Sequence, residues 1–96
     1  MRIIFKDTFL QRLSRQIDYI ALDSSKRARK FKNDVLNEIR RIPDMPYANR
    51  KSIYFDNDQI RDLIFKGYTI VYRINEEDHC IEIFGFTKYQ DKPIDE

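Results

Sequence analysis

The chain has few of the residues that build covalent or metal-dependent sites. It has one cysteine, two glycines and three prolines among 96 residues. Cys80 has no intrachain partner for a disulfide, and no cysteine spacing typical of a metal site is present. This cysteine usage fits a reducing compartment, so we expect a cytoplasmic protein. No glycine-rich phosphate loop, paired catalytic carboxylates or metal cluster can be identified, so we expect no cofactor and no metal.

Long apolar segments are also missing. No apolar run approaches the roughly 20 residues that span a bilayer, so we expect no membrane association. The N-terminus reaches charged residues after the apolar run Ile3–Phe5, which is unlike a signal peptide. Charged residues make up 35% of the chain, yet the formal net charge is only +2. A protein whose main role was to hold phosphate backbones would carry a larger positive excess.

Two amphipathic helices are predicted in the N-terminal half, after a short strand at residues 3–5. Apolar residues recur at helical spacing as Phe9, Leu10, Leu13, Ile17 and Ile20, and again as Ala28, Phe31, Val35, Leu36, Ile39 and Ile42. We expect Asp7 or Thr8 to cap the first helix. The second should run from about Ser25 to about Arg41 and stop before Pro43.

The C-terminal half is predicted to form strands joined by tight turns. The strand candidates are residues 52–55, 60–65, 68–74 and 80–87. The expected fold is therefore α+β, with an N-terminal strand and helical hairpin packed on a twisted antiparallel sheet of three to four C-terminal strands. The expected turn at Lys66-Gly67 uses the freedom of glycine to take positive φ. One domain over residues 1–96 is expected, with a frayed tail at residues 89–96.

Strand alternation predicts which side chains share a face. In the strand at 68–74, the tyrosines and isoleucines form an apolar face, whereas Thr69, Val71 and Arg73 share a face that we expect not to be fully buried. In the last strand, Ile81 and Ile83 are expected on one face, and Phe84 and Phe86 on the other.

Basic residues form two candidate partner-binding clusters. They are Lys26, Arg27, Arg29 and Lys30 on the second helix, and Arg50, Lys51 and Arg61 near the sheet. Such cations suit phosphates or an acidic partner. The sequence leaves open two ordinary interpretations, a solvated helix face and a structural ion pair between Asp62 and a nearby arginine.

Lys88 and Tyr89 follow the last strand, where a rigid sheet can present them to a ligand. A lysine can stabilise developing negative charge, and a tyrosine can exchange a proton. The alternative is that these two residues have no ligand and are only the polar end of the last strand, where the chain leaves the sheet.

The segments Arg61–Ile74 and Ile81–Pro93, together with the strand and two helices before them, resemble the RelE/ParE superfamily of bacterial toxins. The resemblance covers nearly the whole chain, and its most specific part is Arg-Asp-Leu followed by Gly-Tyr-Thr-Ile-Val-Tyr-Arg-Ile. It implies the toxin half of a type II toxin–antitoxin pair, neutralised by binding of a cognate antitoxin. Growth inhibition and plasmid stabilisation are implied with it.

The superfamily has two functional branches. RelE-like toxins cut messenger RNA in the ribosomal A site, whereas ParE-like toxins poison DNA gyrase. RelE-like members commonly carry an arginine in the third strand, where this chain has Thr69. Residues 87–93 resemble the endings of ParE-like proteins. The resemblance therefore implies a ParE-like toxin whose target is gyrase.

A ribosome-dependent mRNA endoribonuclease is the alternative function. In that case Arg73 would hold the scissile phosphate, Lys88 would stabilise charge and Tyr89 would shuttle a proton. A third possibility is a non-toxic remnant that keeps only the contact with an antitoxin.

Overall fold

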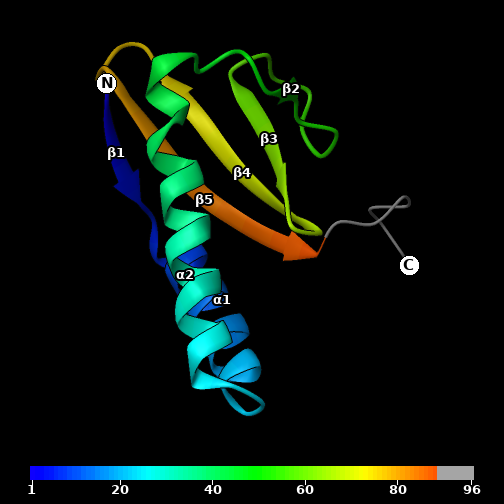
Figure 1. The fold of residues 1–96 in the computed structure, drawn as a ribbon. Coiled ribbons are helices and arrows are strands. Elements are labelled where there is room, and N and C mark those ends of the chain that lie inside the picture. The colour runs from blue at the N-terminus through cyan, green and yellow to red at the C-terminus, as the bar shows by residue number, and fades with distance from the viewer. Residues whose placement is uncertain (89–96) are drawn as a thin grey trace.

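The computed structural model describes residues 1–88, so the expected fraying of residues 89–96 and the placement of Tyr89 lie outside the described residues. A five-stranded sheet and two long helices make up the fold (Figure 1). In chain order the elements are β1 (Arg2–Phe5), α1 (Asp7–Ala21), α2 (Ser25–Arg40), the 3₁₀ turn η1 (Ile42–Asp44), β2 (Arg50–Lys51), β3 (Ile60–Phe65), β4 (Tyr68–Asn75) and β5 (Cys80–Lys88).

The sheet has the strand order β1-β5-β4-β3-β2. Strands β2 to β5 pair antiparallel, as predicted, and the α+β class is confirmed. The N-terminal strand joins the same sheet as a parallel neighbour of β5, with Ile3 opposite Ile81 and Phe5 opposite Ile83. The sheet is therefore mixed, because β1 runs parallel to β5 at one edge, whereas the chain leaves the helical hairpin for β2 at the opposite edge.

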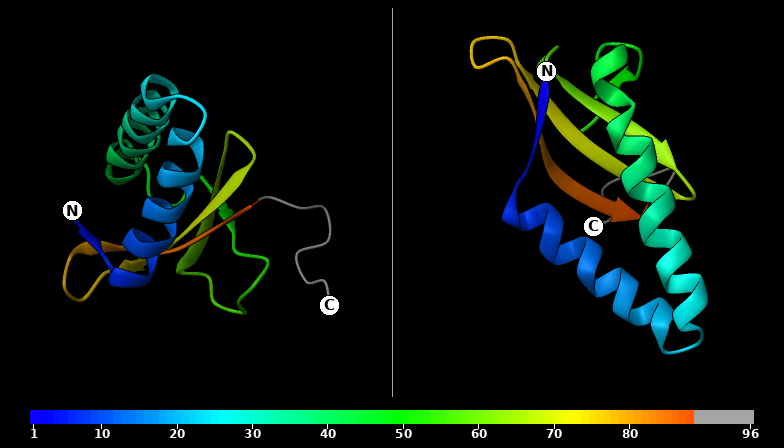
Figure 2. Two further views of the ribbon diagram at one scale, coloured as in Figure 1. Left: turned by 90° about the horizontal axis from the view of Figure 1, so that it is seen from below. Right: turned by 60° about the vertical axis from the view of Figure 1, so that its left-hand side comes forward.

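The helical hairpin covers one face of the sheet (Figure 2). Side chains recur on one face of a helix about every 3.6 residues and on one face of a strand every second residue. The apolar stripes of the two helices therefore pack on alternate residues of the central strands. The buried cluster contains Phe9, Leu13, Phe31, Val35, Ile39, Ile42, Leu63, Ile70, Tyr72, Ile74, Ile81, Ile83 and Phe86. Leu10, expected in the stripe of α1, is 44% exposed instead. The predicted core role of Tyr72 is confirmed.

The two helices begin differently. The predicted cap of α1 by Asp7 or Thr8 is wrong, because the helix starts at Asp7 and Lys6 is its N-cap without a side-chain bond. The Thr8 hydroxyl donates instead to the Phe84 carbonyl at 2.8 Å, which ties α1 to β5. In α2, the Ser24 hydroxyl accepts the backbone N–H of Arg27 at 3.1 Å, and this cap satisfies a donor that the first helical turn leaves free.

The strand predicted at residues 52–55 is wrong, since β2 comprises only Arg50 and Lys51. The Ser52 N–H still bonds the Ile60 carbonyl at 2.8 Å, but the next donors turn away from the ladder. The Ile53 N–H donates to the Asp62 carboxylate at 3.1 Å and the Tyr54 N–H to the Ser52 hydroxyl at 3.2 Å. Side-chain acceptors thus end the strand and start a loop over residues 52–59.

A β-bulge in β5 overturns the predicted face of Phe86, whereas Ile81, Ile83 and Phe84 lie on their predicted faces. Val71 of β4 pairs with Gly85, whereas the next residue, Tyr72, pairs with Ile83, so Phe84 is left without a partner on β4. Because of the extra residue, the side chain of Phe86 lies on the helix-facing side of the sheet, together with Ile81 and Ile83. There the Phe86 ring stacks on Tyr68 with a centroid distance of 5.0 Å.

The bulge brings the two strands close together at Gly85. A Cβ atom at this position would lie 2.9 Å from the Cβ of Val71. The turn before β4 uses glycine differently: Lys66 and Gly67 have φ of 54° and 83°, which confirms the predicted tight turn.

We expect Gly85→Ala to lower the free energy of unfolding by about 1–3 kcal/mol, because the new methyl group overlaps Val71 and forces the strands apart. Urea denaturation measures the change. Gly67→Asn is the matched control, since nothing lies within 4 Å of that position and asparagine tolerates positive φ. Equal stability of Gly85→Ala and the wild type would contradict the close approach.

Candidate partner-binding surface

The three basic residues predicted near the sheet all contact other parts of the chain. The Arg50 guanidinium lies 3.3 Å from the Asp62 carboxylate, whose side chain is fully buried. The Lys51 ammonium lies 3.4 Å from Asp56 and 3.2 Å from Asp58. The hydrogen bond to Asp58 is the main cause of the raised pKa of Lys51. Of the two ordinary interpretations of the basic residues, the structural ion pair is therefore the one found for Arg50, and its partner is Asp62.

Arg61 joins two loops. Its guanidinium donates to the Asp58 carbonyl at 2.8 Å and to the Asn49 carbonyl at 3.2 Å, and it lies 5.0 Å from the centroid of the Tyr47 ring. A planar guanidinium can make all these contacts at once, through its several N–H groups and its face. Arg61 thus holds the loop before β2 and the loop before β3 against each other.

Tyr72 anchors the same region from the core. Its hydroxyl donates to the Pro46 carbonyl at 2.6 Å and accepts from the Asn49 amide at 3.1 Å. The ring is fully buried. Burial raises the pKa of Tyr72 above its usual 10.0, because the phenolate would lose its hydration.

The open face of the sheet, opposite the helices, is more buried than the sequence indicated. Thr69 is fully buried and Val71 is 5% exposed, so the expectation of a partly exposed face is wrong at both positions. Only Arg73 of this set is partly exposed, and its guanidinium lies 2.8 Å from the Glu82 carboxylate. Thr69 stands where RelE-like toxins commonly carry an arginine, and its side chain is not exposed to solvent.

Arg73 and Lys88, the described members of the proposed ribonuclease set, are not brought together. Arg73 lies opposite Glu82, and Lys88 lies opposite Tyr68, five residues away along β4. That separation is roughly 17 Å at the usual rise of a strand. An odd number of residues also places the two side chains on opposite faces of the sheet. Tyr89, the third member, lies outside the described residues.

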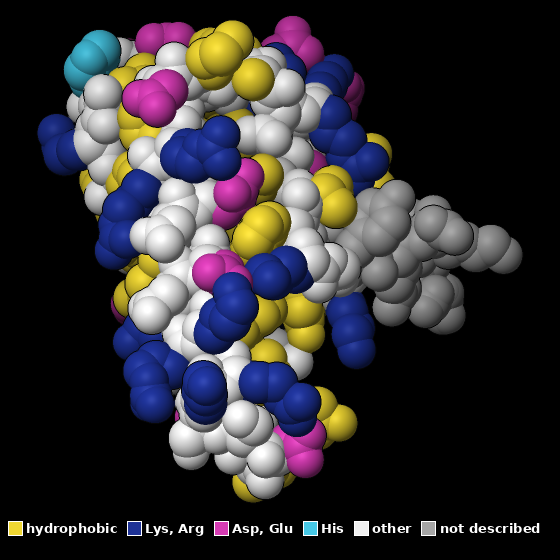
Figure 3. All heavy atoms as spheres, viewed as in Figure 1, with side chains coloured by type: hydrophobic (Ala, Val, Ile, Leu, Met, Phe, Trp, Pro, Cys, Tyr) yellow, Lys and Arg dark blue, Asp and Glu magenta, His cyan; other side chains and the backbone are white. Residues whose placement is uncertain are grey.

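The α2 cations form the more accessible group. Two of them pair locally, Arg27 with Asp23 and Lys30 with Asp34, the second at 2.9 Å. The hydrogen bond from Lys30 is the main cause of the lowered pKa of Asp34. Among residues 1–88, Lys26 and Arg29 have no carboxylate oxygen within 4 Å. Dark blue side chains gather over the lower part of α2 in Figure 3.

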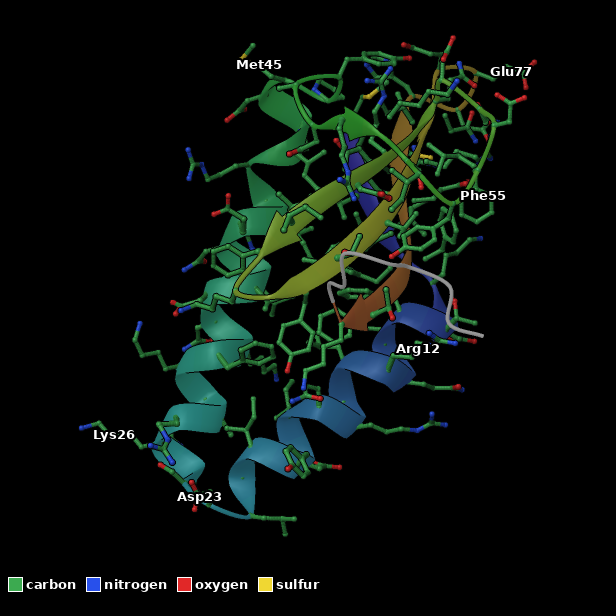
Figure 4. The ribbon with its side chains drawn as sticks, turned by 90° about the vertical axis from the view of Figure 1, so that its right-hand side faces the viewer. Arg12, Asp23, Lys26, Met45, Phe55 and Glu77 are labelled. Carbon is green, nitrogen blue, oxygen red and sulfur yellow. The ribbon has the colours of Figure 1, made fainter. Side chains whose placement is uncertain are left out.

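Sequence reasoning missed a cavity on the open face, between α1, β5 and the 52–59 loop. Its volume is about 460 Å³, and its lining includes Arg12, Tyr54, Phe55 and Phe84. Phe55 packs edge-on against Phe84 but remains 42% exposed, and Figure 4 labels it together with Arg12. The signal that could have indicated this cavity is an aromatic pair, Tyr54-Phe55, within an otherwise polar loop.

Arg12 and Thr8 also protect an unpaired strand edge. The β1–β5 ladder ends at Phe5 and Ile83, so β5 extends beyond its neighbour. Arg12 donates to the Phe86 carbonyl at 3.5 Å, next to the bond that Thr8 makes to Phe84. Side chains of α1 therefore take the place of a strand along this edge.

A scan against protein-family models matches residues 3–91 to the family described as the ParE toxin of type II toxin-antitoxin system, parDE. The chain belongs to the ParE toxin family. A search of the curated proteins returned no match. Family membership implies a cognate antitoxin as the protein partner of this ParE-family chain. Within residues 1–88, no three or more His, Cys, Asp or Glu side chains come together in a way that could hold a metal ion, and no described helix is long and apolar enough to cross a membrane.

Tyr72→Phe in this ParE-family chain should lower the free energy of unfolding by about 1–2 kcal/mol at neutral pH, since the Pro46 and Asn49 contacts lose their hydroxyl. Chemical denaturation measures the change. Tyr19→Phe is the control, because Tyr19 is 69% exposed.

The same variant tests the tyrosine titration. A raised pKa in the folded state stabilises the fold below about pH 10, and this stability is lost as the pH rises through the raised pKa, because the unfolded chain ionises first. We expect Tyr72→Phe to lose less stability than the wild type between about pH 10 and pH 11. An identical alkaline profile would show that Tyr72 ionises as easily in the folded protein as in the unfolded chain.

Proposed function

We propose that this ParE-family chain is the toxin of a type II pair, that it inhibits DNA gyrase in the cytoplasm, and that its antitoxin neutralises it by direct binding. The family match over residues 3–91 is the observation that carries the proposal. Growth inhibition and plasmid stabilisation are part of the same proposal.

The placement of the candidate catalytic residues favours gyrase over messenger RNA as the target. Cleavage of RNA needs an acid, a base and a cation around one phosphate, each within about 3 Å of the atom it serves. Arg73 and Lys88 lie on opposite faces of the sheet, and Arg73 is bound to Glu82. A protein-binding toxin needs no such cluster, only a surface that fits its target.

Exposed apolar side chains support binding of an antitoxin. Leu22 at the hairpin turn is 85% exposed, Tyr19 of α1 is 69% exposed, and Met45 after η1 is 68% exposed. Large exposed apolar side chains are frequent at protein interfaces. An antitoxin that wraps the toxin would remove this surface from water.

The target can be tested with purified components. We expect the full chain, in molar excess, to inhibit supercoiling of relaxed plasmid DNA by gyrase. The protein encoded by a short reading frame directly beside this gene should restore supercoiling when added first. Unchanged supercoiling at excess toxin would reject gyrase as the target. Normal growth on overexpression without the neighbouring gene would instead indicate a non-toxic remnant.

A second experiment separates the two toxic mechanisms. Arg73→Gln and Lys88→Gln should leave growth inhibition unchanged if gyrase is the target, because neither residue then acts on a phosphate. In a ribonuclease, loss of either cation would weaken toxicity by about 100-fold or more. Growth after induction measures the effect, and mapping of messenger 5′ ends is the independent readout. Codon-phased cuts that disappear in both variants would establish the ribonuclease.

A further inference from the structure

Charge is segregated along the molecule, although the net charge is small. Residues 25–33, the first half of α2, contain five cations and no acid. The β4–β5 turn at the other end contains Glu76, Glu77 and Asp78. Figure 4 shows Lys26 and Glu77 at opposite ends of the protein, whose longest dimension is 41 Å. The formal charge of +2 therefore conceals a strongly basic end.

Three cations at this end form one exposed stripe, which we call the α2 stripe: Lys26, Arg29 and Lys32. They recur every third residue, so successive members are about 4.5 Å apart along the helix axis. All three are exposed. Within the described part of the chain, none of them lies within 4 Å of a carboxylate oxygen, in contrast to Arg27 and Lys30.

One member of the α2 stripe, Lys26, is placed where it does not favour the stability of the helix. The N-terminal end of a helix carries partial positive charge, so cations there are unfavourable and acids are preferred. The first turn of α2 contains no acidic residue and includes Lys26 and Arg27. Lys26 thus lies in an unfavourable place, and none of the three stripe cations has an internal acidic partner, which indicates an anionic ligand from outside the chain.

The surroundings of the stripe indicate which anion it fits. Protein interfaces have an apolar core in which lysine is depleted. In residues 24–33, the apolar members Ala28 and Phe31 are buried, so the exposed surface is polar and basic. Single-stranded nucleic acids are held by exposed aromatic rings that stack on bases, and no aromatic ring is exposed within residues 24–33. A rigid row of cations without such rings fits the dense, regular charge of a duplex.

We propose that the α2 stripe binds the phosphate backbone of double-stranded DNA without reading its sequence. Three phosphate contacts made by one helix provide weak binding that depends strongly on salt. A toxin with gyrase as its target would meet duplex DNA at that target, so the stripe would add affinity there. The inference itself depends only on the charge and exposure of α2, and it can be tested without gyrase.

Fluorescence anisotropy of a labelled 20-base-pair duplex of random sequence, titrated with the full chain at several salt concentrations, tests the proposal. We expect a dissociation constant on the order of 10 µM near physiological salt. The triple variant Lys26→Gln, Arg29→Gln, Lys32→Gln should bind at least about tenfold more weakly, and its log–log salt slope should fall by about 0.9 for each lost contact.

A charge-matched variant controls for net charge. Arg2→Gln, Lys6→Gln, Arg40→Gln removes three exposed cations outside the stripe and should bind as the wild type does. Equal weakening in both triple variants would overturn the proposal, because net charge alone would then explain the binding. Absence of duplex binding by the wild type at about 100 µM would overturn it as well. Stripe-dependent binding to a polyglutamate peptide but not to DNA would reject DNA in favour of an acidic protein.

Lys26→Glu separates loss of the ligand contact from loss of the fold. An acid in the first turn of α2 matches the helix dipole, so we expect Tm to rise by about 3 °C. The same change places a negative charge in the stripe and should weaken DNA binding. A variant that is more stable and binds as tightly as the wild type would exclude Lys26 from the contact.

Discussion

The pairing of β4 with β5 is the constraint on which the rest of the structure depends. Strand β4 is bonded to β3 on one side and to β5 on the other, and the bulge at Phe84 shifts the second register by one residue. That shift turns Phe86 toward the helices, where it contacts Tyr68 and Phe9 and so supports α1. The same register separates Arg73 from Lys88. A local irregularity of one residue therefore positions a helix and also decides which charged groups can act together. It is possible only because residue 85 is a glycine, which lets the strands approach at Val71.

The cations of this protein have two physically different roles. Arg50, Lys51 and Arg61 hold loops that contain almost no regular structure, and their contacts replace the backbone ladder that those loops lack. The buried Asp62 carboxylate is central to this arrangement, since it accepts from both Arg50 and the Ile53 N–H. Removal of one partner would leave a charge without compensation in a dry environment. The cations of the α2 stripe are instead exposed and have no carboxylate oxygen within 4 Å among the described residues.

The two helices cover one face of the small sheet, so any binding site must lie on the outer side of the helices or on the opposite face of the sheet. The hairpin presents charge and exposed apolar side chains at its turn, and the open face presents a cavity beside Phe55. Neither is a deep, water-excluding pocket of the kind that supports acid–base catalysis. Membership of the ParE toxin family implies a protein partner, the cognate antitoxin.

Local chemistry in the sequence was sufficient to predict the α+β class, both helices, four of the five strands (β1, β3, β4 and β5) and the Lys66-Gly67 turn. Each of these depends on the spacing of apolar residues or on turn residues within a few positions of one another. The face of Phe86, the short β2 and most partners of the cations could not be predicted in this way, although the pairing of Asp62 with an arginine was one of the open interpretations. Alternation assumes a regular strand, so one extra residue in β5 reverses every face beyond it. The end of β2 depends on a carboxylate at Asp62, nine residues ahead of Ile53 in the chain. Whether a cation binds a partner or an internal acid is likewise decided by which strands meet, because an ion pair needs contact within a few ångströms and the sequence specifies no such distance.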